Sequence, residues 1–370
     1  MAIDFPSSPT DGQVFYPPNG PIYVYRSAKG AWTRNRGTAN TRNILVNPSM
    51  QISQQNGNTS STATAYYLAD QWQSSAGQNH TWQRVAAATP SGSPYRLRVV
   101  SGTAITNTQM SFLQNIEGYR IADLAYGTAN AKYSVLRFGM KGPAGAYACS
   151  FQHYTANYST IVFGFDLPDQ VDTVFTFVVP PGTIDSWPID NGYQVQFFIS
   201  PAMTDAAKTP NVGVWQSAQY SGKTGMSNGA DTVGKTFEIF DVGWYADPNM
   251  TGRAPEFQQA NYEDDLAESQ RYWYKATGLR GLYNTTTTSV RNGAPHPVPM
   301  RITPTQALVG ATLRLYDQGS VQNVTAVANT SSSSNHCDLS ITPAAAQIQY
   351  RRSMLLADAQ EAQYIALSAR

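Results

Sequence analysis

The stretch with the most suggestive chemistry lies between residues 225 and 236. Gly229, Gly234, Lys235 and Thr236 have the spacing of the phosphate-binding loop of nucleotide hydrolases. Such a loop works only between a buried strand and a helix, where backbone N–H groups and the helix dipole converge on the phosphates. The preceding run is polar and glycine-rich, and the following TFEIFDVGWYAD alternates with the period of a strand. We therefore predict a loop that leads into a strand, without nucleotide binding.

A second motif overlaps the first. Gly225, Ser227 and Gly229 have the spacing of the nucleophile elbow of serine hydrolases. That motif also requires a turn from a strand into a helix, because this turn exposes the serine hydroxyl. The flanking residues argue against such a turn, so we predict no serine nucleophile.

Paired carboxylates suggest a third chemistry, the hydrolysis of polysaccharide. The candidates are Asp166, Asp169 and Asp172, or Asp185 and Asp190. Aspartate is common in turns beside Pro and Gly, and a calcium loop would also need a bidentate Glu that this spacing lacks. The four histidines, His80, His153, His296 and His336, have no partners at metal-ligand spacing beyond the adjacent Cys337. We predict that the protein is not an enzyme and holds no metal or cofactor.

The composition indicates a weakly charged surface rich in hydroxyl and amide groups. Charged residues make up 13% of the 370 residues and the net charge is +1. Nucleic-acid binding is therefore not expected, because it depends on clustered Lys and Arg. The sequence shows neither a signal-peptide pattern nor an apolar run of membrane-spanning length, so no membrane insertion is expected. Cys149 and Cys337 are expected to be free thiols formed in a reducing cytosol.

The pattern of strands and turns predicts a mainly β protein in three parts. Residues 1–40 contain two short strands, PIYVYR and AWTR, in a hairpin too small to fold alone, so this module should dock onto something. Residues 41–260 predict a jelly-roll-like β-sandwich in which one face of each strand meets a core and the other meets water. Its core candidates are Trp72, Phe138, Phe177 and Trp244. Residues 261–370 predict one helix followed by a C-terminal β-sandwich.

Two finer patterns lie within these parts. In the strand after Lys235, period-two alternation places Phe237 and Trp244 on opposite faces. The helix is predicted over residues 261–276, with Asn261 as its cap and acidic residues in its first turn. Leu266, Gln270 and Trp273 would share one face of this helix.

Several short motifs resemble bacteriophage tail-fibre and related virion proteins. Similarity to the N-terminal module of that family lies in Asp4-Phe5-Pro6, Pro9, Gly12-Gln13 and Gly30-Ala31-Trp32. Similarity to the start of its sandwich domain lies in Arg42-Asn43, Leu45, Asn47, Met50, Asp70 and Trp72. Similarity to the junction with its terminal β domain lies in Pro255-Glu256-Phe257, Tyr262, Asp265-Leu266 and Gln270-Arg271-Tyr272. The chain departs from the family at Gln71, where Arg is frequent, and at Ser269, where Cys is frequent.

The resemblance implies a structural subunit of a homotrimeric fibre or appendage in the virion. Its partners would be copies of itself and virion proteins of the tail, collar or capsid. The N-terminal module would dock on the particle through Phe5, Pro6, Pro9, Tyr23, Tyr25 and Trp32. The helix face with Leu266, Gln270 and Trp273 is the candidate trimer seam. A capsid-decorating, head-fibre or collar protein with a purely structural role is the alternative.

The resemblance also suggests contact with host-surface polysaccharide, because the middle sandwich is similar to carbohydrate-binding jelly rolls. Tyr158, Trp187, Trp215 and Tyr220 stand beside turns, where exposed rings could stack on sugars. Trp187, which precedes Pro188, could equally plug one end of the sandwich. Both interpretations remain open at the level of sequence.

Overall fold

The computed structural model describes residues 5–15, 23–34, 40–75, 79–153, 159–182, 186–276, 282–309, 313–317, 320–349, 351–356 and 364–370. The chain packs into two compact units. Unit 1 contains Met1–Met50, Asn58–Leu68 and Trp72–Gln259, and unit 2 contains Gln51–Gly57, Ala69–Gln71 and Ala260–Arg370. The three-part division at residues 40 and 260 stays a prediction about domains.

The N-terminal module is a three-stranded antiparallel sheet. Its strands are β1 (Val14–Phe15), β2 (Tyr23–Arg26) and β3 (Ala31–Arg34), in that order across the sheet. The predicted hairpin is present, and a single 3-10 turn, η1 (Ser27–Lys29), joins its strands. Gly30 ends the turn with a φ of 56°, a left-handed conformation that suits glycine. The sequence Pro18-Asn19-Gly20 also predicts a turn, which lies outside the described residues.

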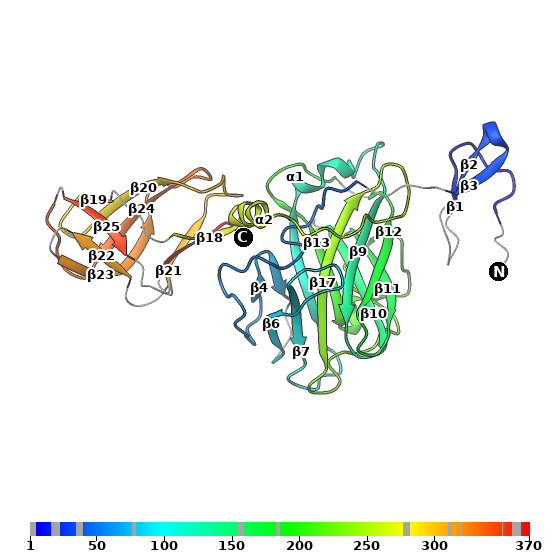
Figure 1. Cartoon of the computed structure of the whole chain (residues 1–370), viewed down its shortest axis with the longest axis horizontal. Coiled ribbons are helices and arrows are strands. Elements are labelled where there is room, and N and C mark those ends of the chain that lie inside the picture. Colours follow the sequence, from blue (N-terminus) through cyan, green and yellow to red (C-terminus); the bar gives the residue numbers. More distant parts are fainter. Residues whose placement is uncertain are drawn as a thin grey trace. The chain divides into compact units, whose positions relative to one another are not determined.

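Unit 1 is dominated by two stacked β-sheets (Figure 1), which confirms the prediction of a mainly β sandwich. The larger sheet has the order β15 (Gln216–Ser217), β11 (Ser159–Leu167), β10 (Gly145–His153), β13 (Tyr193–Ala202), β8 (Met110–Glu117), β5 (Trp72–Ser74) and β4 (Tyr67–Ala69). The smaller sheet has the order β12 (Thr173–Val179), β9 (Ser134–Lys141), β17 (Thr236–Ala246), β7 (Tyr95–Val100) and β6 (Thr81–Ala86). Short elements complete the unit: α1 (Gly118–Ile121), η2 (Ala122–Leu124), η3 (Asp205–Ala207), and the parallel pair β14 (Lys208–Thr209) and β16 (Gly222–Lys223).

The core between the two sheets is built from aromatic side chains. Trp72, Phe138 and Trp244 are at most 1% exposed, as predicted. Phe177 is only half-buried, because β12 is an edge strand, but its ring packs against Phe138 and Phe163.

A β-bulge in β17 changes the predicted alternation. The register against β9 shifts between Phe240 and Gly243, and Asp241 has a φ of 49°. Because the bulge inserts one extra residue, the side chains after it point to the face opposite the one that simple alternation predicts. Phe237 and Trp244 therefore both face the core, where they contact Tyr147 and Phe151 on one face of β10. The prediction that they lie on opposite faces is wrong for this reason.

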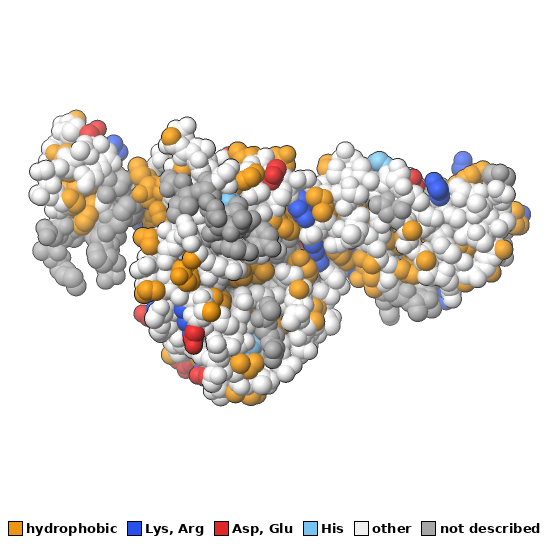
Figure 2. Space-filling view, turned by 180° about the vertical axis from the view of Figure 1, so that it is seen from behind, with side chains coloured by type: hydrophobic (Ala, Val, Ile, Leu, Met, Phe, Trp, Pro, Cys, Tyr) orange, Lys and Arg blue, Asp and Glu red, His pale blue; other side chains and the backbone are white. Residues whose placement is uncertain are grey.

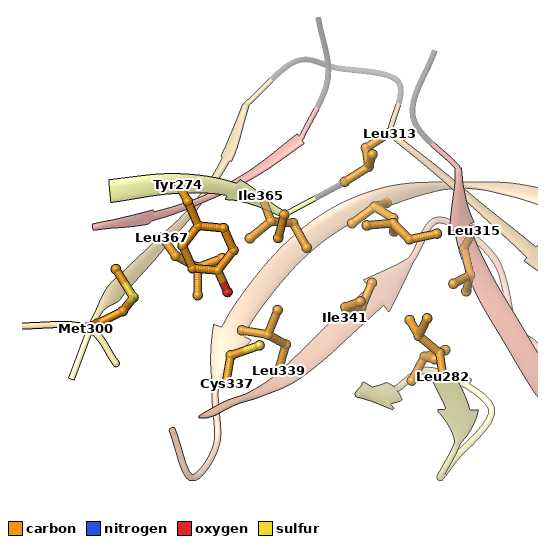
Figure 3. Close-up of a cluster of buried hydrophobic side chains, with 14 of the residues drawn as sticks. Tyr274, Leu282, Met300, Leu313, Leu315, Cys337, Leu339, Ile341, Ile365 and Leu367 are labelled. Carbon is orange, nitrogen blue, oxygen red and sulfur yellow. The ribbon is translucent and has the colours of Figure 1, made fainter. Parts of the chain in front are cut away.

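Unit 2 consists of one helix, a three-stranded sheet and a closed barrel. The helix is α2 (Tyr262–Gln270), and the sheet has the order β18 (Trp273–Ala276), β26 (Tyr364–Ser368) and β21 (Thr305–Val309). The barrel runs through β19 (Leu282–Asn284), β20 (Val290–Pro295), β24 (His336–Pro343), β23 (Ser320–Asn329), β22 (Arg314–Asp317) and β25 (Arg352–Leu356). The predicted C-terminal sandwich thus takes the form of a barrel and an adjoining sheet. One apolar cluster fills both, and Figure 3 shows Leu282, Leu315 and Ile341 inside the barrel.

The helix is shorter than predicted. It begins after Asn261, whose Oδ1 accepts a hydrogen bond from the backbone N–H of Glu263 at 2.9 Å. It ends at Gln270, and Trp273 begins β18, where it lies opposite Ser368 of β26. The prediction that Trp273 shares a helical face with Leu266 and Gln270 is therefore wrong. Strand pairing by the aromatic run that starts at Tyr272 overrides the helical continuation.

The two cysteines, Cys149 and Cys337, are both free and buried. No helix among the described residues is long and apolar enough to cross a membrane.

Candidate functional site

The loop that resembles a phosphate-binding motif is held by its own side chains. Lys235 Nζ lies 2.6 Å from Asp231 Oδ1, so the lysine is paired within the loop. The residues after it form β17, the longest strand of the chain, instead of a helix. Ser227 is also occupied, because its Oγ accepts a hydrogen bond from the backbone N–H of Ala146. The predicted loop that leads into a strand is confirmed, and the absence of a nucleotide site and of a serine nucleophile stays a prediction.

Three of the candidate acidic residues bind three different partners. Asp172 forms an ion pair with Arg96 at 2.6 Å, which lowers the pKa of its carboxyl group. Asp169 accepts a hydrogen bond from the N–H of Ala144, and Asp190 accepts one from the N–H of Gly192. Asp166 is exposed, and residue 185 lies outside the described residues. Within the described ranges, no three His, Cys, Asp or Glu side chains gather in a way that could hold a metal ion.

A different site lies on the outer face of the seven-stranded sheet, where three amide side chains form a row across neighbouring strands. Gln152 of β10 lies opposite Gln196 of β13, which lies opposite Asn115 of β8. Gln196 Nε2 donates a hydrogen bond to Asn115 Oδ1 at 3.0 Å. Opposed residues share one face of a sheet. We call Asn115, Gln152 and Gln196 the amide row.

The flanking residues show that the amide row faces away from the core. Phe151 and Phe197 alternate with the glutamines, and their rings stack at 4.9 Å inside the sandwich. A second row runs beside the amide row on the same outer face. It consists of Ser150, Phe198, Leu113 and Gln73, each opposite the next.

Two polar atoms on this face lack hydrogen-bond partners among the described residues. They are Nε2 of Gln152 and Oγ of Ser150, two residues apart on β10. Gln152 is 1% exposed and Ser150 is 0% exposed. An unpaired buried polar group destabilises a protein by about 1–3 kcal/mol, so a hydrogen-bond partner that reaches these atoms would stabilise the site. Gln196 and Asn115 are half-buried and extend the same face toward solvent.

A covering segment closes one side of this face. The strand β16 packs over β10 and β11, and the stem of Lys223 lies so close to Gly164 that a Cβ there would be 2.5 Å from Lys223 Cδ. Tyr220 packs against the adjoining cluster of Ala148 and Val162. Thr160, opposite Gln152, donates its hydroxyl to the carbonyl of Ala218 at 2.8 Å. Tyr220 therefore lies against β10 and β11 near Val162, which is opposite Ser150 of the second row, and its predicted role in glycan binding stays a prediction.

Trp187 and Trp215 lie elsewhere, in an aromatic cluster with Tyr126 and His153. The Trp187 ring stacks on His153 at 3.9 Å and meets Tyr126 at 5.1 Å and Trp215 at 5.5 Å. Trp187 is 7% exposed, and Trp215 Nε1 donates to the carbonyl of Pro180. This packing favours the plug interpretation, although glycan binding by these residues stays a prediction. Tyr158 lies outside the described residues.

The predicted docking residues gather in the N-terminal module. Phe5 stacks on Trp32 at 5.4 Å and meets Tyr23 edge-on at 4.9 Å, and Tyr25 meets Trp32 at 5.6 Å. These rings and Pro6 are half-buried, as is Pro9. The module thus presents a compact aromatic cluster, and its role in docking stays a prediction.

One face of the molecule carries few charges. Figure 2 shows scattered acidic and basic side chains there among uncharged polar side chains, backbone and hydrophobic side chains. The amide row itself contains no ionisable group. Each amide can donate and accept hydrogen bonds, which matches the donor and acceptor character of sugar hydroxyls.

Sequence reasoning found the strands of this site but not the site itself. Alternation along residues 193–197 predicts that Gln196 faces away from Val195 and Phe197, and the structure agrees. What the sequence did not show is that Gln152 and Asn115 lie opposite it, because strand order and register are long-range properties. Amides at the same parity in several strands are the signal that could have indicated a shared face.

Comparison with known proteins gives remote similarity only. No protein-family model and no curated protein matches the chain. A family 11 carbohydrate-binding module of a Clostridium thermocellum cellulase matches with 11% identity over 51% of this chain and 96% of that chain, with a TM-score of 0.27. A carbohydrate-binding module solved with β-1,4-galactotriose matches with 11% identity over 56% of this chain and 99% of that chain, with a TM-score of 0.30.

The enzymatically active domain of tailspike protein 4 of bacteriophage CBA120 is also similar. It matches with 14% identity over 51% of this chain and 21% of that chain, with a TM-score of 0.29. The structural neighbours thus include carbohydrate-binding modules and a phage tailspike domain. Scores of this size carry no functional argument, so the function is inferred below from the side chains.

Proposed function

We propose that the protein is a glycan-binding structural subunit of a bacteriophage appendage and that its sandwich binds a neutral polysaccharide through the amide row. The observation that carries the proposal is the pair of unpartnered buried atoms, Gln152 Nε2 and Ser150 Oγ, on the outer face of the seven-stranded sheet. A binding site for sugar hydroxyls needs such groups held in place by rigid strands.

The geometry supports an extended ligand. The amide row crosses three adjacent strands, β10, β13 and β8, which are about 4.8 Å apart. Phe198 and Leu113 lie in the second row beside it and supply apolar surface. Because no charged side chain belongs to the amide row, hydrogen bonds rather than ion pairs would select the ligand, which favours a neutral glycan.

Binding, rather than catalysis, is the proposed role. The acidic side chains considered for hydrolysis are engaged in separate contacts, with Asp172 on Arg96 and Asp190 on the N–H of Gly192. These contacts keep the two carboxylates in structural roles. A reducing-sugar assay on host polysaccharide tests this part, with no release of sugar expected.

The experiment for the binding site is a glycan array with the full chain, followed by affinity electrophoresis in the neutral polysaccharide that binds best. Gln152→Ala and Gln196→Ala should each weaken binding about tenfold, the loss of roughly one good hydrogen bond. Gln258→Ala is the matched control, because Gln258 is an exposed glutamine of unit 1 outside this sheet face. Equal binding by all three variants would remove the amide row from the proposal.

A further inference from the structure

The exterior of the C-terminal barrel carries exposed arginine and tyrosine side chains. In β22, Leu315 is buried while Arg314 and Tyr316 on either side are exposed. In β25, Ser353 and Leu355 are buried, whereas Arg352 and Met354 are exposed. This alternation fixes which side chains point out of the barrel.

Strand register joins these exterior residues into one band. Tyr283 of β19 lies opposite Arg291 of β20 on one side and opposite Arg352 of β25 on the other. Opposed Cβ atoms are about 4.5–5.5 Å apart, so Tyr283 lies between Arg291 and Arg352 on the exterior of the barrel. The next exterior residue of β25, Met354, lies opposite Tyr316 of β22, and Tyr316 lies opposite Val321 of β23. We call Arg291, Tyr283, Arg352, Met354, Tyr316 and Val321 the arginine band.

The arginine band is exposed, and no ion pair neutralises its charges within the described part of the chain. Tyr283 is 43% exposed, Tyr316 is 38% exposed and Met354 is 37% exposed. Among the described residues, Arg291, Arg314 and Arg352 take part in no ion pair. The strand β24 adds one exterior carboxylate, Asp338, which lies opposite Gly293 and not opposite the band.

We propose that the arginine band is a second polysaccharide-binding surface, selective for glycans that carry carboxylate or phosphate groups. Guanidinium groups bind such anions with paired, charge-assisted hydrogen bonds, and exposed tyrosine rings can pack on sugar rings. This proposal does not depend on the amide row, which lies in unit 1 and contains no charged group. A second copy of this chain meeting the band face to face would oppose arginine with arginine, so the charge favours an anionic polymer as the occupant.

The test uses the full chain in affinity electrophoresis with polygalacturonate and with its fully methyl-esterified, neutral form. We expect retardation by the carboxylated polymer only, and weaker retardation as salt concentration rises. The double variant Arg291→Gln/Arg352→Gln should raise the Kd at least about tenfold, which corresponds to about 1.4 kcal/mol. Arg253→Gln is the matched control, because Arg253 is exposed on unit 1. Gln152→Ala should leave this binding unchanged, which separates it from the amide row.

Three outcomes would overturn the assignment. The first is an equal loss of binding in the Arg253→Gln control, or no binding of polygalacturonate by the unaltered chain. The second is tighter binding of a single-stranded oligonucleotide of equal charge, which would indicate a nucleic-acid surface. The third is a change of oligomeric state in Tyr316→Ser/Met354→Ser at an unchanged melting temperature, which would indicate a contact between copies of the chain.

Discussion

At the scale of single residues, the protein separates polar groups that hold the fold from polar groups available to a ligand. Arg96 illustrates the first kind, because its guanidinium binds Asp172, Glu238 and the carbonyl of Ala88. Gln152 illustrates the second kind, since its buried Nε2 has no partner among the described residues. Single unpartnered buried atoms, such as Arg96 Nε, also occur elsewhere among the described residues, so the proposed binding face rests on Gln152 and Ser150 lying together on one outer face of the sheet.

The Arg96 ion pair predicts a pH dependence of stability. Hydrogen bonding to Arg96 lowers the pKa of Asp172 below its usual range. The carboxylate therefore stabilises the fold above the unfolded-state pKa of about 4, and this contribution is lost as the pH falls through the lower folded-state pKa. In urea unfolding followed from pH 7 to pH 2, Asp172→Asn should be less stable at pH 7 and should show a flatter acid profile. Asp166→Asn, at an exposed position, should follow the unaltered protein.

The aromatic cluster predicts a second effect at residue scale. Trp187 packs among Tyr126, His153 and Trp215, so Trp187→Ala leaves a cavity at the end of the sandwich. We expect a loss of about 3–5 kcal/mol in the free energy of unfolding. An unchanged melting temperature together with lost cell attachment would instead support the prediction that Trp187 binds glycan.

At the scale of elements, local pattern predicted which segments form strands better than which side each residue faces. The pattern predicted the two hairpin strands β2 and β3 and the long strand β17. The bulge at Asp241 was not predicted, because a one-residue insertion in the register leaves no signal in hydrophobic alternation.

The strand β8 shows why some elements were missed. Gln114 interrupts its apolar side, although this side chain is 1% exposed and faces the core. There its side-chain amide pairs with the backbone of Val46 as a neighbouring strand would. Its Oε1 accepts a hydrogen bond from the N–H of Val46 and its Nε2 donates one to the carbonyl of Val46, each at 2.9 Å. A buried glutamine satisfied by distant backbone cannot be recognised from local sequence. The same limit applies to the amide row, whose members lie far apart along the chain.

The helix cap gives a prediction at element scale. Asn261→Ala removes the side-chain acceptor for the N–H of Glu263 and should destabilise unit 2 by about 1 kcal/mol. Asn261→Asp keeps an acceptor and adds a favourable charge at the helix N-terminus, so its stability should be retained. Chemical denaturation monitored by circular dichroism measures both effects, and equal stability of the Ala variant would contradict the assigned cap.

At the scale of the whole molecule, the protein has two units of β structure, and unit 1 includes a small aromatic module. The module of β1, β2 and β3 has five aromatic rings in mutual contact, from Phe5, Phe15, Tyr23, Tyr25 and Trp32. A sheet of this size is marginal in isolation. Its predicted role in docking and the predicted trimer both remain to be measured.

Deletion of residues 1–40 tests the docking role. The remaining chain should keep its melting temperature, because the sandwich core with Trp72, Phe138 and Trp244 does not include the deleted residues. The truncated protein should bind glycan as before but should no longer be incorporated into phage particles when it is supplied in place of the full chain. Normal incorporation would show that attachment to the particle resides elsewhere.

The most direct test of the central claim is an experimental structure of the full chain with the best neutral oligosaccharide from the array. The account predicts sugar hydroxyls within hydrogen-bond distance of Gln152 and Ser150, with the chain of sugars running across β10, β13 and β8. Oligosaccharide bound against Trp187 and Trp215 instead, with the amide row unoccupied, would contradict it.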